Sequence, residues 1–278
     1  MLAGLLLSGC AEGSPTGPKP SGGPSGTTGA PTATVAPPSA FASASPSSSV
    51  TPTGSGARTP GPSAEPTAPA GSDPALGAGL QPLWPFTSLA RAREWQRSYR
   101  DGGHQPWHLD AEQTALAFVR DFLGFRELDR VASQRVSGRH ARIGIGPSAP
   151  EEARRSTAAV VHLVRYGTGA DAPWEVVGTD DTTFSLTAPA YGAAARSPLR
   201  VGGRITGVDE SIRVEVRGPS SPRPLGTACC VPGGGTRQPW TATVAYSGAT
   251  DPVLTVVAST GGHVNEVERF TVTAVRPR

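Results

Sequence analysis

The stretch Ile212-Arg213-Val214-Glu215-Val216 alternates aliphatic and charged side chains. Successive side chains of a β-strand point to opposite faces, so this stretch predicts a strand with one face against a core and the other in water. Turn residues such as Gly218-Pro219 and Asp251-Pro252 separate it from its neighbours. The same period of two recurs through residues 183–278, at Phe184 and Leu186, Leu199 and Val201, 240–246, 254–258, and Phe270 and Val272. Some seven short strands in under 100 residues predict an antiparallel β-sandwich.

Several of these runs carry a more specific pattern. They are Leu186-Thr187-Ala188-Pro189, Ser197-Pro198-Leu199-Arg200-Val201-Gly202-Gly203, Ile212-Arg213-Val214-Glu215-Val216, Trp240 ahead of Thr243-Val244, and Leu254-Thr255-Val256. Together they resemble the immunoglobulin-like domain of bacterial sporulation and spore-germination proteins. The resemblance implies an extracytoplasmic sandwich that assists envelope assembly or adhesion and has no known active site. The chain departs from that pattern at 225–239, which we interpret as an enlarged loop.

Residues 82–182 predict an α+β domain, with helices first and antiparallel strands after them. Ser88 or Thr87 begins one helix, which Asp101-Gly102-Gly103 ends, and Asp110 begins a second, which ends at Gly124. We expect strands at 139–145, 158–166 and 174–177. This order of elements resembles the small α+β domains of the nuclear-transport-factor or cystatin type found in envelope lipoproteins.

The amino-terminal part of the chain differs in composition from the rest. Residues 11–80 hold 14 of the 29 prolines and only five charged side chains, so we expect a disordered tether. Ahead of it, Leu7-Ser8-Gly9-Cys10 ends an apolar run over residues 1–10 and resembles the bacterial lipobox. That resemblance implies a lipid on Cys10 and a protein held on the outer face of the cell membrane. The run lacks a preceding Lys or Arg and is short for a signal peptide, so we expect the natural start to lie upstream.

The remaining cysteines, Cys229 and Cys230, are adjacent. In an exported protein we favour a disulfide between them, with two free thiols or bridges to other chains as the alternatives. Neither a second cysteine pair nor a nearby histidine completes four ligands, so we expect no metal.

The chain shows no recognisable catalytic motif. His104 and His108 are four residues apart, but Pro106 between them is incompatible with a helix that would put both rings on one face. We expect His140 and His162 to be structural or solvated.

These observations predict a non-enzymatic envelope protein, without a cofactor, that contacts another envelope protein or a cell-wall glycan. A net charge of +3 without a dense basic patch argues against nucleic acid as a partner. One alternative is a cell-wall or carbohydrate hydrolase that uses Glu94, Asp110, Glu175 or His108. Another is a small-ligand binder whose first domain encloses an apolar cavity.

Overall fold

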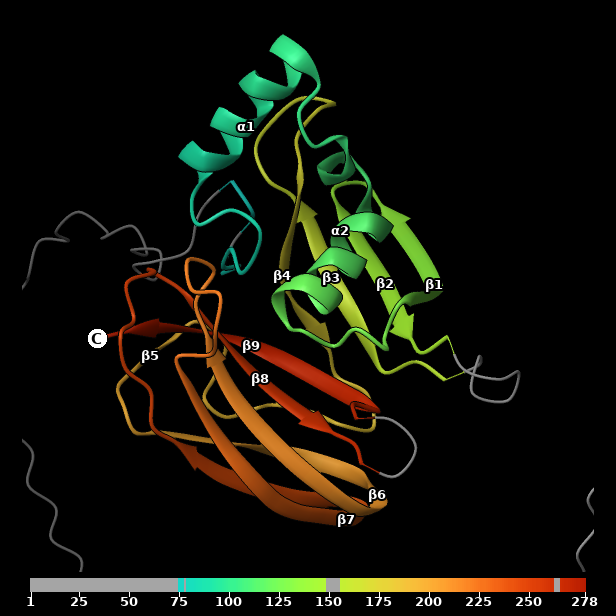
Figure 1. Ribbon diagram of the computed structural model, residues 1–278, viewed down its shortest axis with the longest axis vertical. Helices are drawn as coiled ribbons and strands as arrows, with labels where there is room; N and C mark the ends of the chain where they lie inside the picture. Colours follow the sequence, from blue (N-terminus) through green and yellow to red (C-terminus); the bar gives the residue numbers. More distant parts are fainter. Residues whose placement is uncertain (1–74, 78, 149–155, 263–265) are drawn as a thin grey trace, which may run out of the picture. The chain divides into compact units, whose positions relative to one another are not determined.

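A computed structural model describes residues 75–77, 79–148, 156–262 and 266–278, all within one compact unit of the chain. Cys10 and nearly all of the expected tether lie outside the described residues. The described part is mostly β-sheet with few helices, and its strands form a four-stranded antiparallel sheet and a five-stranded mixed sheet (Figure 1). None of its helices has the length and apolar character needed to cross a membrane.

Helical segments precede the first sheet, and the two α-helices begin where the sequence predicts. Ser88 caps the first by accepting a hydrogen bond from the backbone N–H of Arg91, and Gly103 ends it in the left-handed conformation. Asp110 caps the second by accepting from two backbone N–H groups of the first turn. The segments are α1 (Leu89–Gly102), the 3-10 turn η1 (Pro106–Leu109), α2 (Ala111–Ala117) and the π-helical turn η2 (Phe118–Phe122).

The first sheet has the strand order β1-β2-β3-β4, with every pair antiparallel. Its strands are β1 (Arg130–Ser137), β2 (His140–Gly146), β3 (Ala159–Arg165) and β4 (Trp174–Asp180). Ile143, Val161 and Val176 are fully buried in one core together with Phe118 and Val119 from the helical side. The sequence did not predict β1, an edge strand with mostly exposed side chains and therefore little apolar alternation.

The second sheet has the strand order β5-β9-β8-β6-β7, and β5 runs parallel to β9 while the other pairs are antiparallel. Its strands are β5 (Ala193–Ala195), β6 (Leu199–Arg217), β7 (Gly226–Val244), β8 (Leu254–Thr260) and β9 (Arg269–Pro277). The runs that the sequence assigned to two strands, around Leu199 and around Ile212, belong to the single strand β6. Phe184, expected in a strand of its own, makes only an isolated bridge to Ile205.

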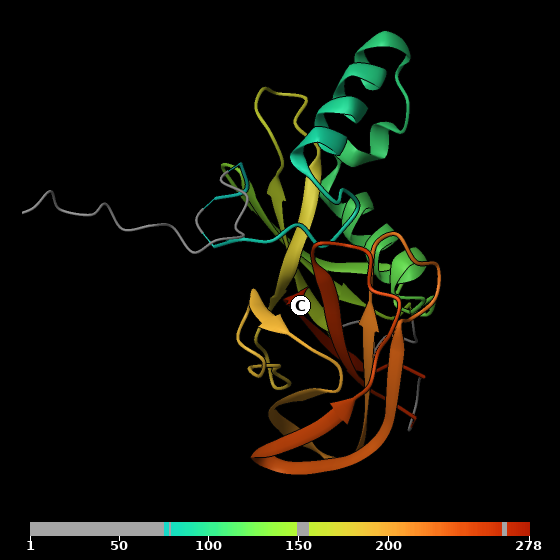
Figure 2. The same cartoon turned by 90° about the vertical axis from the view of Figure 1, so that its left-hand side faces the viewer.

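The interpretation of 225–239 as an enlarged loop is wrong, because most of this segment lies within β7 and pairs with β6. Glycine explains how such a sequence forms a strand. A Cβ on Gly233 would lie 2.9 Å from Cδ1 of Ile212, so the missing side chain leaves room for a core residue of the neighbouring strand. The pairing of β6 with β7 changes register around Gly207, and the long hairpin curls over its own core (Figure 2).

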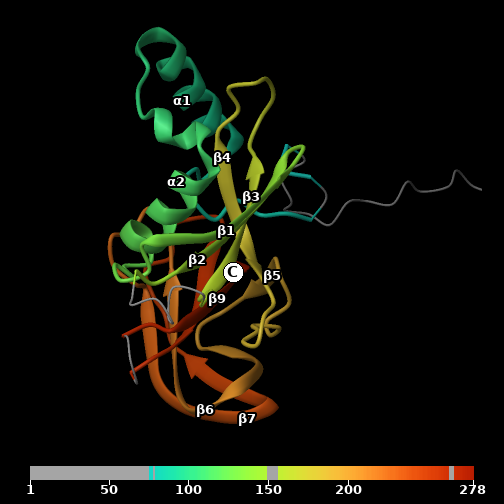
Figure 3. The ribbon, with the colours of Figure 1, turned by 90° about the vertical axis from the view of Figure 1, so that its right-hand side faces the viewer.

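Strands β8 and β9 are buried on both faces and take part in two separate cores (Figures 1 and 3). Leu254 and Val256 pack inside the curled second sheet, whereas Val257 and Val272 pack against the first sheet and its helices. All seven residues of β8 are buried, as a strand between two apolar layers requires.

Hydrogen bonds join the two sheets along the same boundary. The N–H of Phe270 donates to the carbonyl of Ala158 at 3.2 Å, and the N–H of Val272 donates to Thr179 Oγ1 at 2.9 Å. The second sheet therefore completes the core of the first.

We expect Phe270→Ala to destabilise both sheets together by about 3–5 kcal/mol, because the ring is buried in the core that the sheets share. Phe270→Leu, which keeps more of the volume, is the milder control. Urea unfolding followed by tryptophan fluorescence and by far-ultraviolet circular dichroism checks this, since Trp174 and Trp240 lie in different cores. Two separate transitions in the wild-type protein would contradict a shared core.

Candidate functional site

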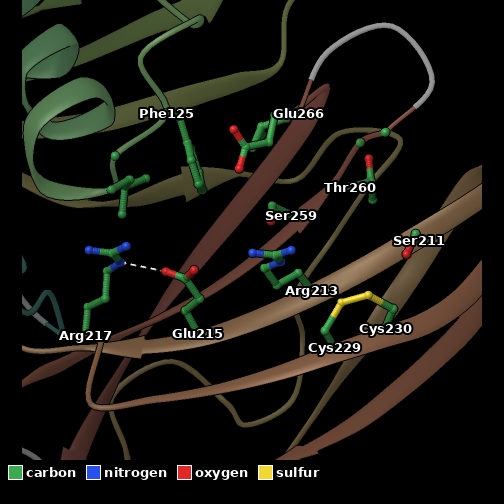
Figure 4. Close-up of a pocket in the computed structure, with 15 residues that line it drawn as sticks. Phe125, Ser211, Arg213, Glu215, Arg217, Cys229, Cys230, Ser259, Thr260 and Glu266 are labelled. Carbon is green, nitrogen blue, oxygen red and sulfur yellow. Dashed lines mark hydrogen bonds and ion pairs between the residues drawn. A yellow bond between two sulfur atoms is a disulfide. The ribbon is translucent and has the colours of Figure 1, made fainter. Parts of the chain in front are cut away.

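A cavity of about 360 Å³ lies where the segment after η2 meets the outer face of β6, β7 and β8 (Figure 4). Ligand sites in proteins commonly range over about 300–1,000 Å³, so this one suits a small molecule. Its walls come from both halves of the described chain, since Leu123, Gly124 and Phe125 follow the helices and the remaining lining residues belong to the second sheet or its loops.

One wall of the cavity is the charged face of β6. Because Ile212, Val214 and Val216 point into the core, Arg213, Glu215 and Arg217 point the other way, spaced by about 6.6–6.8 Å along the strand. The alternation that forms the strand thus also builds this wall, with a basic residue at each end of the row and an acidic one between them.

Arg217 and Glu215 are engaged with other groups of the protein. Arg217 Nε donates to Glu215 Oε2 at 2.8 Å, and the two side chains are only 11% and 13% exposed. The Nη1 group of Arg217 donates to the carbonyl of Phe122 at 2.7 Å. This arginine therefore fastens the end of η2 to the second sheet, and its charge is balanced by Glu215.

Arg213 differs from Arg217, because its exposed guanidinium has no hydrogen bond or ion pair with any other described residue. In Figure 4 it stands in the same row as Glu215 and Arg217, while Phe125 and Glu266 reach toward the row from the opposite side. Glu266 is exposed and likewise makes no hydrogen bond or ion pair within the described part of the chain. The cavity thus presents a cation and an anion that do not neutralise one another.

Hydroxyl groups and a disulfide complete the lining. Ser211, Ser259 and Thr260 all line the cavity, and Thr260 Oγ1 is buried without a hydrogen-bond partner in the described structure. A disulfide joins Cys229 and Cys230, which lie on β7 beside Arg213 (Figure 4). Its sulfur atoms give the cavity a polarisable apolar surface.

The acidic residues that we considered as candidates for a hydrolase, Glu94, Asp110 and Glu175, do not form a catalytic pair in either of the cavities described here. Glu94 pairs with Arg91 at 3.0 Å on the exposed face of α1. It shares a second, open cavity of about 610 Å³ with His104. Asp110 is the cap of α2. The structure does not bring Glu94, Asp110 and Glu175 together in either cavity.

The histidines also have packing roles. His108 is buried against Phe86, Trp95 and Trp107, and burial lowers the pKa of its ring to about 4. His140 Nδ1 and His162 Nε2 lie 3.0 Å apart. The described residues contain no group of three or more side chains placed to hold a metal ion.

Glu175 is fully buried in β4, and burial raises the pKa of its carboxyl group well above the usual value. Its Oε2 accepts a hydrogen bond from the backbone N–H of Phe86 at 3.0 Å, whereas Oε1 has no partner in the described structure. This acid lines neither of the two cavities, and it holds the chain segment before α1 against the first sheet.

Sequence reasoning missed Arg213 and Glu266 as site residues. The alternating stretch marked Arg213 only as the outer face of a strand, and Glu266 carried no signal of its own. The segment 123–125 lies over this outer face of β6 and so makes it one wall of a cavity. Comparison of the chain with family models, curated proteins and solved structures gives no match.

We expect Glu175→Gln to remove a pH dependence of stability. The pKa of this carboxyl group is raised in the folded protein. Its contribution to folding stability is therefore complete below its pKa in the unfolded chain, about 4.5, and declines as the pH rises above that value. The stability of the variant relative to wild type should therefore increase between pH 5 and pH 8. Chemical denaturation at several pH values measures this.

Glu94→Gln is the matched control for Glu175→Gln, because it makes the same change at an exposed position. A constant difference between Glu175→Gln and wild type across the pH range would show that Glu175 is ionised in the folded protein.

Proposed function

We propose that this chain is a lipid-anchored binding protein of the cell envelope that holds a small polar ligand in the cavity beside Arg213. The observation that carries the proposal is that Arg213, whose guanidinium has no partner among the described residues, lines a cavity together with Glu266. A cavity with a few convergent polar groups is the usual form of a small-molecule site. Neither charge is needed to hold the two walls together, because Arg217 already does this through Phe122.

Binding is favoured over hydrolysis by the positions of the candidate acids. Two-carboxylate glycosidases hold their acids about 5–10 Å apart on either side of the bond that they cleave. Glu94 is paired with an arginine, Asp110 is a helix cap and Glu175 is buried away from both cavities. The cavity beside Arg213 contains Glu215 and Glu266, but Glu215 is paired with Arg217.

The second sheet supports a binding role through its form. We propose that it is a variant of the immunoglobulin-like sandwich in which one curled sheet, rather than two facing sheets, encloses the core. The long strands β6 and β7 fold over Val214, Trp240 and Val256, so one face is sealed inside while the outer face is left for a ligand. A further partner, either an envelope protein or a cell-wall glycan, is part of the proposal.

The proposed location rests on the sequence Leu7-Ser8-Gly9-Cys10, which resembles a lipobox, and on the proline-rich segment that follows it. A lipid on Cys10 would hold the folded part on the outer side of the membrane.

We expect radiolabelled palmitate to enter the protein expressed from its full natural gene, and Cys10→Ser to abolish the labelling and release the protein from the membrane fraction. Cys229→Ser is the control, since Cys229 belongs to the disulfide of the folded part and its replacement should leave labelling unchanged. Equal labelling of wild type and Cys10→Ser, or a cytosolic wild-type protein, would contradict the anchor.

We expect the soluble Cys10→Ser protein to retain a small molecule from an extract of its own cells, detected by equilibrium dialysis and mass spectrometry. Ser211→Trp in the same background should lose it, because the indole would occupy the cavity that Ser211 lines. Ser137→Trp, on the exposed edge strand β1, is the matched control. A retained compound that Ser211→Trp does not affect would place binding elsewhere, and the absence of any retained compound would contradict the proposed function.

A further inference from the structure

We propose that the cavity ligand is a monosaccharide that carries one anionic group, a carboxylate or a phosphate. This inference rests on the proposed function, and it specifies the ligand class by matching each wall of the cavity to a part of such a molecule.

The anionic group follows from the charges that line the cavity. Of its two arginines, Arg217 is neutralised by Glu215 and also bound to a backbone carbonyl, whereas Arg213 has no partner among the described residues. A guanidinium offers parallel N–H donors that match the two oxygens of a carboxylate or phosphate. Among the described residues, Arg213 is therefore the group that would bind the anionic part of a ligand.

The hydroxyl groups of a sugar follow from the remaining polar side chains. Glu266 is ready to accept hydrogen bonds, and the hydroxyls of Ser211 and Ser259 can both donate and accept. An amino acid, with one carboxylate and one ammonium group, would leave most of these hydroxyls unused.

The apolar faces of a sugar ring follow from the rest of the lining. A pyranose presents C–H groups on its faces and hydroxyls around its rim, so it needs apolar surface as well as hydrogen bonds. The ring of Phe125 and the Cys229–Cys230 disulfide provide that surface. A volume of about 360 Å³ is at the small end of the range for ligand sites, which favours a single sugar unit over a long glycan.

The test uses the full chain carrying Cys10→Ser and isothermal titration with glucuronate, glucose 1-phosphate and glucose. We expect at least one of the two anionic sugars to bind at least tenfold more tightly than glucose, and the comparison between them identifies whether carboxylate or phosphate is preferred. Arg213→Gln should weaken binding of that sugar at least tenfold, because it removes the charge-assisted hydrogen bonds. Arg200→Gln, an exposed arginine of β6 outside the cavity, is the matched control and should bind like the parent protein.

Other outcomes separate this inference from the proposed function. Equal affinity for glucose and the anionic sugars, or binding that Arg213→Gln does not weaken, would overturn the anionic-sugar assignment. Absence of sugar binding, together with retention of another compound that Ser211→Trp abolishes, would overturn the ligand class and leave the binding function standing. Absence of both would overturn the two proposals together.

Discussion

The structure depends on strands β8 and β9, which separate two apolar cores and contribute side chains to both. Alternate residues of a strand face opposite ways, so Leu254 and Val256 stabilise the curled sheet while Val257 packs under the first sheet. The helices and β1 to β4 could not bury their apolar faces without this outer surface of β8 and β9, to which Phe270 and Val272 also belong. The two sheets, which the sequence analysis assigned to different domains, therefore share one hydrophobic core.

The shared interior also positions the cavity. Since the first sheet and η2 rest on β8 and β9, the segment 123–125 is held over the neighbouring strands β6 and β7. The hydrogen bond from Arg217 to the carbonyl of Phe122 fixes this contact at one point, on the strand face that also carries Arg213 (Figure 4).

Much of the fold could be predicted from short-range patterns, because capping residues and periods of two act locally. Ser88 and Asp110 marked the helix starts, and the alternation at Ile212 to Val216 marked part of β6. The continuity of β6 and β7 could not be predicted in the same way, because glycines that normally interrupt strands here accommodate side chains of the facing strand. The cavity was hidden for a similar reason: the residues that cover Arg213 lie some 90 positions earlier in the chain.

The alternation in the segment 212–217 of β6 lets it contribute to two parts of the structure. Its even-numbered aliphatic residues lie in the core, and its odd-numbered charged residues line the cavity. Inserting or deleting one residue ahead of Ile212 would exchange the two faces, turning guanidinium groups inward and aliphatic chains outward. Evolution can therefore change the side chain at position 213 without disturbing the interior, but a change in the length of this segment would disrupt both the core and the cavity wall.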